Sequence, residues 1–452
     1  MHRFDELTER IARVVYAYTD ARLRLDPVPL DRTVDPATLA ALAPDPIGPA
    51  GNDPEAVMAT FERVLAPAVI SCDSPRFLAF IPAAPTKASL LFDMVVSASS
   101  LSGVSWLEAA GAVHAENQAL RFLADLVGLP RDAGGCFVPG GSAANLSALA
   151  VARDTARRSG APTGRRLRVV VGEQAHASIA NALRLLDLEP LVVAAPDDRL
   201  DGAAVAAALD ADGDAASVCA VAATAGTTNA GIVDDLAGVA EVCARHRLWM
   251  HVDAAYGGAA LLAPSARPRF AGIERADSVV IDPHKWLFAP FDCAALLYRD
   301  PALARATHTQ DASYLDVIHD EPGVWNPSDL AHHLTRRARG LPLWFSLAVH
   351  GTDAYRDAIE RVLATARAAA ARVAAAPHLE LVREPELSIV LFRRRGWAGP
   401  DYDAWARRLL DEQVAFVAPS RWHGEPVARL AFLHPGTTIE IVDEVLASTR
   451  AG

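Results

Sequence analysis

The sequence has 452 residues, 51% of them hydrophobic, so it can bury the core of roughly two or three packed domains. Its formal net charge of −12 argues against nucleic acid or an anionic membrane as a partner, because either would need a basic face, and a small-molecule substrate fits better. The five cysteines include no Cys-x-x-Cys pair, and we find neither a signal-peptide core nor an apolar run approaching the ~20 residues of a spanning helix. We therefore expect a cytoplasmic protein with reduced thiols.

The chain divides into three predicted parts. Residues 1–74 carry helical patterns on both sides of a proline-rich stretch, Asp26 to Pro54, and predict an N-terminal helical arm. In residues 75–340, short apolar segments alternate with helical ones, which predicts an α/β domain with a mostly parallel sheet. Strands are expected at Leu167–Val171, Val218–Ala223, Trp249–Val252 and Ser278–Ile281.

Residues 341–452 predict a smaller C-terminal α+β domain. An alanine-rich segment from Asp353 to Ala376 has arginines at helical spacing, and alanine is the strongest helix former. Strand candidates follow at Leu387–Phe392 and Val427–Phe432.

The first motif with chemical meaning follows a predicted strand that ends near Val138. The turn Gly140-Gly141-Ser142 opens a long helix through Arg158. Backbone N–H groups at a helix start, together with a hydroxyl, form a site for an anion such as a phosphate. Alone, this turn is a weak signal, and it matches neither a dinucleotide-binding nor a Walker A pattern.

Three further strand ends carry polar side chains. They are His176 in Ala-His-x-Ser, Thr224 in Ala-Thr-Ala-Gly-Thr-Thr, and Asp253 in His-Val-Asp-Ala-Ala-Tyr. Open α/β sheets bind ligands at the carboxyl ends of their strands. Each residue also has a plain structural interpretation, such as a satisfied histidine, a hydroxyl-capped loop or a helix cap.

The sharpest signal is Lys285, which follows the apolar strand Ser278–Ile281 in the sequence Asp282-Pro-His-Lys-Trp. An isolated lysine there would usually extend its ammonium to water. A lysine that forms a Schiff base must instead be partly desolvated, so that its amine is often neutral, and a strand end above a sheet provides this.

Taken in order, these five motifs resemble the pyridoxal phosphate-dependent group II amino-acid decarboxylases, of which aromatic-L-amino-acid decarboxylase is the best-known branch. The likeness extends from Ser74-Pro-Arg-Phe to Arg429-Leu-Ala-Phe-Leu-His-Pro and so covers nearly the whole chain. The resemblance implies the fold-type-I, aminotransferase-like architecture. It also implies a homodimer with active sites at the interface, dimerised partly through the arm, and no metal.

The resemblance also assigns roles. Lys285 would hold the cofactor as a Schiff base, Asp253 would pair with the pyridine nitrogen, and His176 and Ala255 would lie against opposite faces of the ring. Tyr314 would sit on a mobile lid, in a polar stretch that runs on to Gly323, and would reach a neighbouring active site. The remaining cofactor-binding residues would be Gly141, Ser142, Thr224 and His284.

Several positions depart from the family pattern. Many members have Asn where this chain has Asp282, and a carboxylate there would be repelled by a phosphate, so Asp282 is expected to point away or to cap a backbone amide. Ala83 replaces a common pocket threonine, and the segment after Trp106 differs from that of aromatic decarboxylases. With Tyr314, Ala83 and Trp106 are the expected substrate-binding residues. Ala83, Ala84 and Trp106 suggest a roomy apolar pocket.

The expected reaction is decarboxylation of an L-amino acid, aromatic by preference, to the amine and carbon dioxide. Tyr314 and His176 would help to protonate Cα, and Asp253 would stabilise the electron-rich cofactor. Four alternatives stay open: oxidative deamination to an aldehyde, an aminotransferase that uses Arg429 as a carboxylate clamp, another lyase, and a non-enzymatic relative. Retention of both Lys285 and Asp253 argues against the last.

Overall fold

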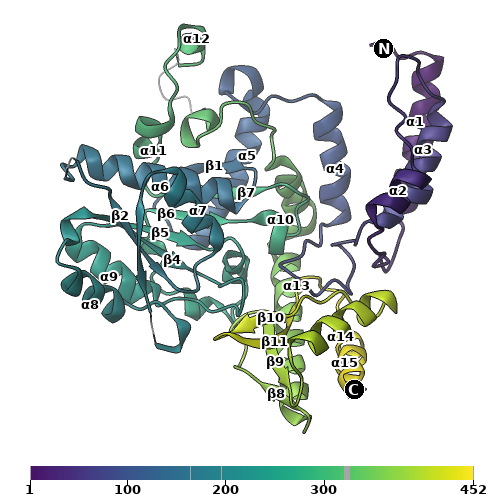
Figure 1. Ribbon diagram of the computed structural model, residues 1–452. Coiled ribbons are helices and arrows are strands. Elements are labelled where there is room, and N and C mark those ends of the chain that lie inside the picture. Colours follow the sequence, from purple (N-terminus) through teal and green to yellow (C-terminus); the bar gives the residue numbers. More distant parts are fainter. Residues whose placement is uncertain (1, 163, 195, 320–325, 451–452) are drawn as a thin grey trace.

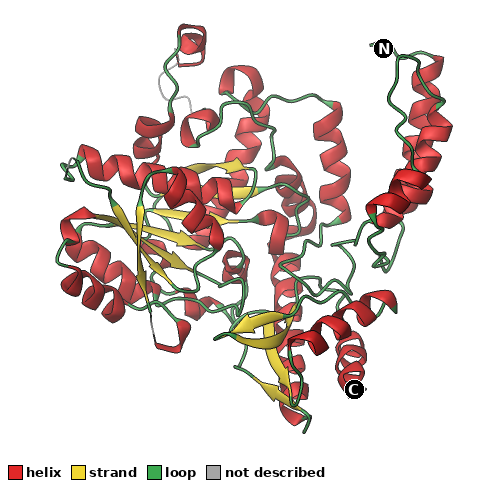
Figure 2. Cartoon of the chain, in the orientation of Figure 1, coloured by secondary structure: helices red, strands yellow, loops and turns green. Residues whose placement is uncertain are grey.

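The computed structural model describes residues 2–162, 164–194, 196–319 and 326–450. In that part of the chain, a seven-stranded sheet forms the centre of the large domain, and a separate four-stranded antiparallel sheet lies below it (Figure 2). No helix in these ranges is long and apolar enough to cross a membrane.

The large sheet has the strand order β1-β7-β6-β5-β4-β2-β3. Its neighbours from β6 to β3 are parallel, whereas β7 is antiparallel to both β1 and β6. The predicted mostly parallel α/β sheet is therefore confirmed, and the expected strands agree to within one residue. The strands are β1 Gly134–Val138, β2 Arg168–Gly172, β3 Glu189–Val193, β4 Val218–Thr224, β5 Trp249–Asp253, β6 Ser278–Ile281 and β7 Ala294–Tyr298.

Helices cover both faces of this sheet, which is why its central strands are continuously apolar. On one face lie α6 Gly141–Arg158, α7 Ala177–Leu185 and α11 Pro301–His308. On the other lie α5 Trp106–Val127, α8 Gly202–Asp212 and α9 Leu236–His246. The short α10 Pro283–Trp286 follows β6 directly, and α12 Asp316–His319 projects from the body (Figure 1).

The first three helices form an arm that stands beside the rest of the molecule (Figure 1). They are α1 Glu6–Leu23, α2 Pro36–Leu42 and α3 Pro54–Thr60, and none of them has a buried residue. Arg22 of α1 is tied to Asp73 by an ion pair of 2.8 Å. After the arm, α4 Lys87–Ala98 packs against the first part of the long helix α13.

Helix α13, Leu341–Ala375, links the two sheets. Its start packs on α4 and α5, its backbone breaks at Gly351 where φ is 75°, and its later part packs on the small sheet. That sheet has the order β10-β11-β9-β8 and is accompanied by α14 Gly399–Asp411 and α15 Ile439–Ala447. Its strands are β8 Leu379–Leu381, β9 Ile389–Arg394, β10 Ser420–Trp422 and β11 Glu425–Ala431.

The division at residues 74 and 340 stays a prediction. The large sheet, the small sheet and the arm nevertheless fall within the three predicted segments.

Candidate active site

A cavity of about 280 Å³ opens where β4, β5 and β6 end, facing the start of α6. Its size is near the lower limit of small-molecule sites, ~300 Å³. All eight residues expected to bind the cofactor line this cavity: Gly141, Ser142, His176, Thr224, Asp253, Ala255, His284 and Lys285. Parallel strands bring their carboxyl ends to one edge of a sheet, so motifs far apart in sequence meet here.

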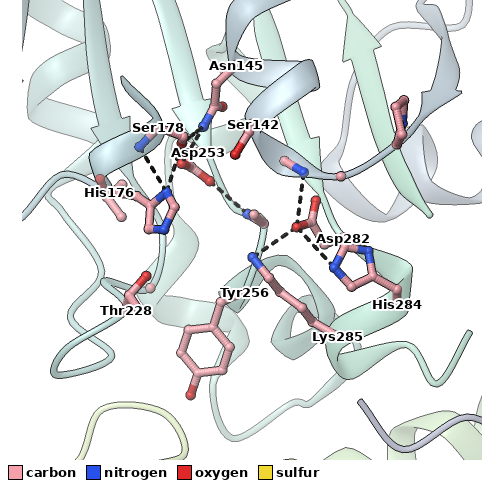
Figure 3. Close-up of a pocket in the computed structure, with 16 residues that line it drawn as sticks. Ser142, Asn145, His176, Ser178, Thr228, Asp253, Tyr256, Asp282, His284 and Lys285 are labelled. Atoms are coloured by element: carbon pink, nitrogen blue, oxygen red, sulfur yellow. Dashed lines mark hydrogen bonds and ion pairs between the residues drawn. The ribbon is translucent and has the colours of Figure 1, made fainter. Parts of the chain in front are cut away.

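Lys285 enters the cavity from α10, one turn beyond β6 (Figure 3). Its Nζ lies 2.9 Å from Oδ2 of Asp282, whose side chain is only 1% exposed. The same Oδ2 accepts a hydrogen bond from the Gly141 N–H at 3.3 Å and lies 3.8 Å from Nε2 of His284. Of the two arrangements expected for Asp282, the structure shows the second: the carboxylate faces the cavity and accepts from a backbone amide.

This contact changes the expected state of the lysine. Burial lowers the pKa of Lys285, but the carboxylates of Asp282 and Asp253 outweigh that effect, and the net direction is upward. The expectation that desolvation would leave the amine often neutral is therefore wrong for the chain without its cofactor. The reason is the buried carboxylate of Asp282, three residues before the lysine.

Asp253 ends β5 and forms the opposite side of the cavity. Its Oδ2 accepts a hydrogen bond from Nδ2 of Asn145 at 2.8 Å, and its Oδ1 accepts from the Ala255 N–H at 3.1 Å. Both donors are N–H groups, which suits a carboxylate because it only accepts. Asp253 is 6% exposed and faces the cavity, where it can receive a proton-bearing ring nitrogen.

His176 is the N-cap of α7 and lies at the exposed mouth of the cavity (Figure 3). Its Nδ1 accepts a hydrogen bond from the Ser178 N–H at 3.2 Å and lies 2.8 Å from Ser178 Oγ. The loop after β4 forms another wall. At the end of β4 the Thr224 N–H donates to buried Asp234, which follows that loop, at 2.6 Å, and burial raises the pKa of Asp234 to about 7.

The start of α6 fits an anion. Gly140 has φ of 97°, a conformation that favours glycine, and it provides no side-chain cap for the helix. A Cβ added to Gly141 would lie 3.0 Å from Asp282 Oδ2 and 3.3 Å from the Cβ of Ala255, so a side chain would intrude on the cavity. With an amine, a carboxylate and this helix start around one space, the residues fit an aldehyde-bearing pyridine with a phosphate.

Three predicted site residues do not line this cavity. Ala83 is buried elsewhere, Trp106 packs half-buried at the start of α5, and Tyr314 is 71% exposed just before α12. Residues 320–323, the end of the predicted lid, lie outside the described residues. The substrate and lid roles therefore stay predictions.

Sequence reasoning missed Asn145, Ser178 and Tyr256, which also line the cavity. Asn145 stands three residues after Ser142 on the same helix, so its helical spacing was the available signal. Tyr256 is the last residue of the Asp253 motif, stacks on Trp286 at 5.4 Å, and shares a hydrogen bond with Ser388 of the small domain.

Comparisons with known proteins agree with this chemistry. Residues 36–395 match the pyridoxal-dependent decarboxylase conserved domain. The chain is 32% identical to tryptophan decarboxylase 1 of Oryza sativa subsp. japonica, over 83% of this chain and 80% of that one. It is 33% identical to L-2,4-diaminobutyrate decarboxylase of Rhizobium meliloti, over 89% and 82% of the two chains.

A solved structure gives the same result. The crystal structure of Oryza sativa TDC with PLP and tryptamine has a TM-score of 0.91 and 28% identity, over 99% of this chain and 98% of that one. The matched domain spans most of the chain and includes the whole cavity. The chain thus belongs to the pyridoxal-dependent decarboxylase family and is a pyridoxal phosphate-dependent amino-acid decarboxylase.

Proposed function

We propose that this enzyme converts an aromatic L-amino acid to its amine and carbon dioxide. The observation that carries the reaction is the presence of Lys285, Asp253 and His176 around one cavity of about 280 Å³. The similarity to tryptophan decarboxylase 1 and to the tryptamine-bound TDC supports an aromatic substrate. The similarity to L-2,4-diaminobutyrate decarboxylase supports a basic side chain as the second candidate.

When bound, pyridoxal phosphate supplies an electron sink for the pair released as the carboxylate leaves. We assign the attachment of the cofactor to Lys285. We assign to Asp253 the role of keeping the ring nitrogen protonated, because a carboxylate beside that nitrogen stabilises the positive ring. Gly141 and Ser142 at the start of α6 would hold the phosphate, and Thr224 and His284 would line the same space. His176 and Ala255 would confine the ring between them.

The α-carboxylate of the substrate must be lost in a part of the cavity from which water is excluded. Tyr256 lines the cavity with Lys285 and stacks on buried Trp286 behind it. After carbon dioxide departs, a proton must reach Cα, and we assign that delivery to Tyr314 with the help of His176.

Because Tyr314 does not line the cavity of its own chain, we propose that it serves the second subunit of a homodimer. The exposed apolar surface of the arm supports this assembly. On α1, Leu7, Ile11 and Val15 are 51%, 41% and 41% exposed and recur every four residues, so they form one face of the helix. An apolar face of this kind is stable when another chain covers it.

A product assay tests the reaction. The purified holoenzyme is incubated with each common L-amino acid and with L-2,4-diaminobutyrate, while carbon dioxide, amine, aldehyde and peroxide are measured. We expect amine and carbon dioxide in equal amounts, with the highest kcat/KM for an aromatic substrate. Aldehyde and peroxide as the main products would replace this proposal with oxidative deamination, and a preference for diaminobutyrate would replace the substrate class.

A mixed dimer tests the role of Tyr314. Tyr314→Phe and Lys285→Ala chains are each expected to make little amine as homodimers, Tyr314→Phe with rising aldehyde. Co-expressed, they restore one complete site only if the tyrosine acts on the partner's lysine. Recovery of activity in the mixed dimer supports the assignment, and its absence in a dimer of confirmed composition contradicts it.

A further inference from the structure

A continuous chain of buried hydrogen bonds runs beneath the cavity, and the proposed mechanism does not use most of its members. It starts at Trp249 on β5, runs through Ser278 and His251 to Asn145 on α6, and ends at Asp253 and at His176. Figure 3 shows the part of it that lines the cavity, from Asn145 to Asp253 and through Ser178 to His176. Trp249, Ser278, His251 and Asn145 are each at most 7% exposed. Because each bond in such a chain needs one donor and one acceptor, the groups at its ends determine its direction.

The amide orientation of Asn145 follows from its neighbour Asp253. The carboxylate oxygen Oδ2 of Asp253 lies 2.8 Å from Asn145 and can only accept, so the NH₂ group of Asn145 must face it. The carbonyl Oδ1 of Asn145 is then directed to His251 Nε2, at 2.9 Å. If the amide were flipped, Oδ1 of Asn145 would face Oδ2 of Asp253, and two acceptor oxygens would be in contact.

The ring of His251 carries its proton on the side of Asn145. Oδ1 of Asn145 only accepts, so His251 Nε2 donates to it. Burial lowers the pKa of His251 to about 4, so its ring has a single proton at neutral pH. Nδ1 then accepts from the hydroxyl of Ser278 at 2.8 Å, and that hydroxyl in turn accepts from the indole N–H of Trp249 at 2.8 Å.

The second N–H of the same amide reaches the other end of the chain. Asn145 Nδ2 donates to Ser178 Oγ at 2.9 Å, which leaves the Ser178 hydroxyl proton free to point to His176 Nδ1. The Ser178 backbone N–H also donates to this Nδ1 at 3.2 Å, so Nδ1 carries no proton. A neutral His176 therefore holds its proton on Nε2.

We propose that Asn145, held by His251, is a positioning residue that orients the Asp253 carboxylate and, through Ser178, fixes His176 with its proton on Nε2. One amide thereby sets the geometry of the two groups that the proposed function places at the ring nitrogen and at the ring face. The inference rests on the proposed function for the roles of Asp253 and His176, whereas the hydrogen bonds around Asn145 stand without it. Of the titratable groups, His251 and Asp253 contact Asn145 directly, His176 is reached through Ser178, and Lys285 interacts with Asp253 across the cavity.

The decisive variant is Asn145→Asp, which keeps the shape and replaces NH₂ by a carboxyl oxygen beside Asp253. That oxygen can bridge to Asp253 only while one of the two carboxyl groups is protonated. The dissociation constant of pyridoxal phosphate, measured by equilibrium dialysis and divided by the wild-type value at each pH, should therefore rise with pH. The expected slope approaches about tenfold per pH unit, the value for one linked proton.

The second variant, Asn145→Ala, removes the amide without adding a charge. Its cofactor affinity should fall about 10- to 100-fold at every pH, as when a partner that orients a functional group is lost. In ¹⁵N-histidine NMR spectra, the wild type should show both His176 and His251 protonated on Nε2, with assignments from His176→Gln and His251→Gln. In Asn145→Ala, the signals of His251 Nε2 should shift because its acceptor is gone.

Ser147→Ala is the matched control, since Ser147 is buried on the same helix and bonds to Ala143 and His332 instead. It should behave like the wild type in both measurements. A proton on Nδ1 of wild-type His176 or His251, a pH-independent ratio for Asn145→Asp, or an equal effect of Ser147→Ala would each overturn the inference. Should Asn145→Asp fail to fold, Asn145→Ala and the wild-type spectra decide. Because neither readout requires turnover, failure of the proposed reaction would appear separately, in the product assay.

Discussion

Replacing Asp282 by asparagine tests the electrostatic control of Lys285. Two unit charges 2.9 Å apart attract by about 6 kcal/mol at an effective dielectric constant of about 20. The cost of burying the pair offsets part of this energy. If only about 2 kcal/mol of net stabilisation of the ammonium is lost, the fraction of neutral amine at a given pH rises more than tenfold.

The assay is the rate at which pyridoxal phosphate is captured by the cofactor-free protein, followed by absorbance in a stopped-flow instrument between pH 6 and 10. Only the neutral amine can attack the aldehyde, so Asp282→Asn should react more than tenfold faster near neutral pH, and its rate should level off at a lower pH. Loss of repulsion toward the phosphate would raise the rate without moving the pH at which it levels off, so the shift of the profile isolates the amine. Asp292→Asn, at a half-exposed carboxylate paired with Arg339, is the control.

The ion pair of Lys285 with Asp282 also affects the stability of the folded chain. The folded-state pKa of Lys285 is raised above its unfolded value of about 10.4, so the pair stabilises the folded chain below that pH and ceases to do so as pH rises through the folded value. At neutral pH the cofactor-free Asp282→Asn protein should therefore melt at a lower temperature than the wild type. An unchanged capture profile together with an unchanged melting temperature would refute the reasoning.

Four other predictions follow from the structure. Borohydride reduction should fix the cofactor to Lys285, as identified by peptide mass spectrometry, and Lys285→Ala should abolish turnover. Asp253→Asn should retain the fold by circular dichroism but lower kcat by ~10²-fold or more, because a charge-assisted hydrogen bond is lost where negative charge develops. The pKa of His251 falls from 6.5 in the unfolded chain to about 4 in the folded chain, so the unfolded chain takes up this proton at a higher pH. As pH falls from 6.5 to 4, this difference should lower the free energy of unfolding by about 3 kcal/mol, measured by urea unfolding. Gly135→Ala should prevent soluble expression or lower the melting temperature severely, since its Cβ would lie 1.8 Å from the Leu296 carbonyl oxygen in the paired strand β7.

The fold and the cavity could be predicted from the sequence because both depend on order along the chain. Apolar strands followed by turns predicted the parallel sheet, and the sheet brings Thr224, Asp253 and Lys285 to one edge. The direction of the Lys285 pKa could not be predicted, since it depends on how the Asp282 side chain turns at the end of β6. The contacts of Asn145 with β5 were equally hidden, because they cross between elements more than 100 residues apart in the sequence.

The contacts of Arg429 bear on which reaction the scaffold performs. An aminotransferase must hold the α-carboxylate of its substrate with a firm cation, and Arg429 is the small-domain candidate for that clamp. Its guanidinium, 5% exposed, instead donates to the backbone carbonyls of Thr228 and Asn229, and burial lowers its pKa to about 10. An arginine that fixes the loop beside the cavity in this way is already engaged as a structural link between the domains. Arg429 is therefore not available as the carboxylate clamp, which argues against the aminotransferase alternative.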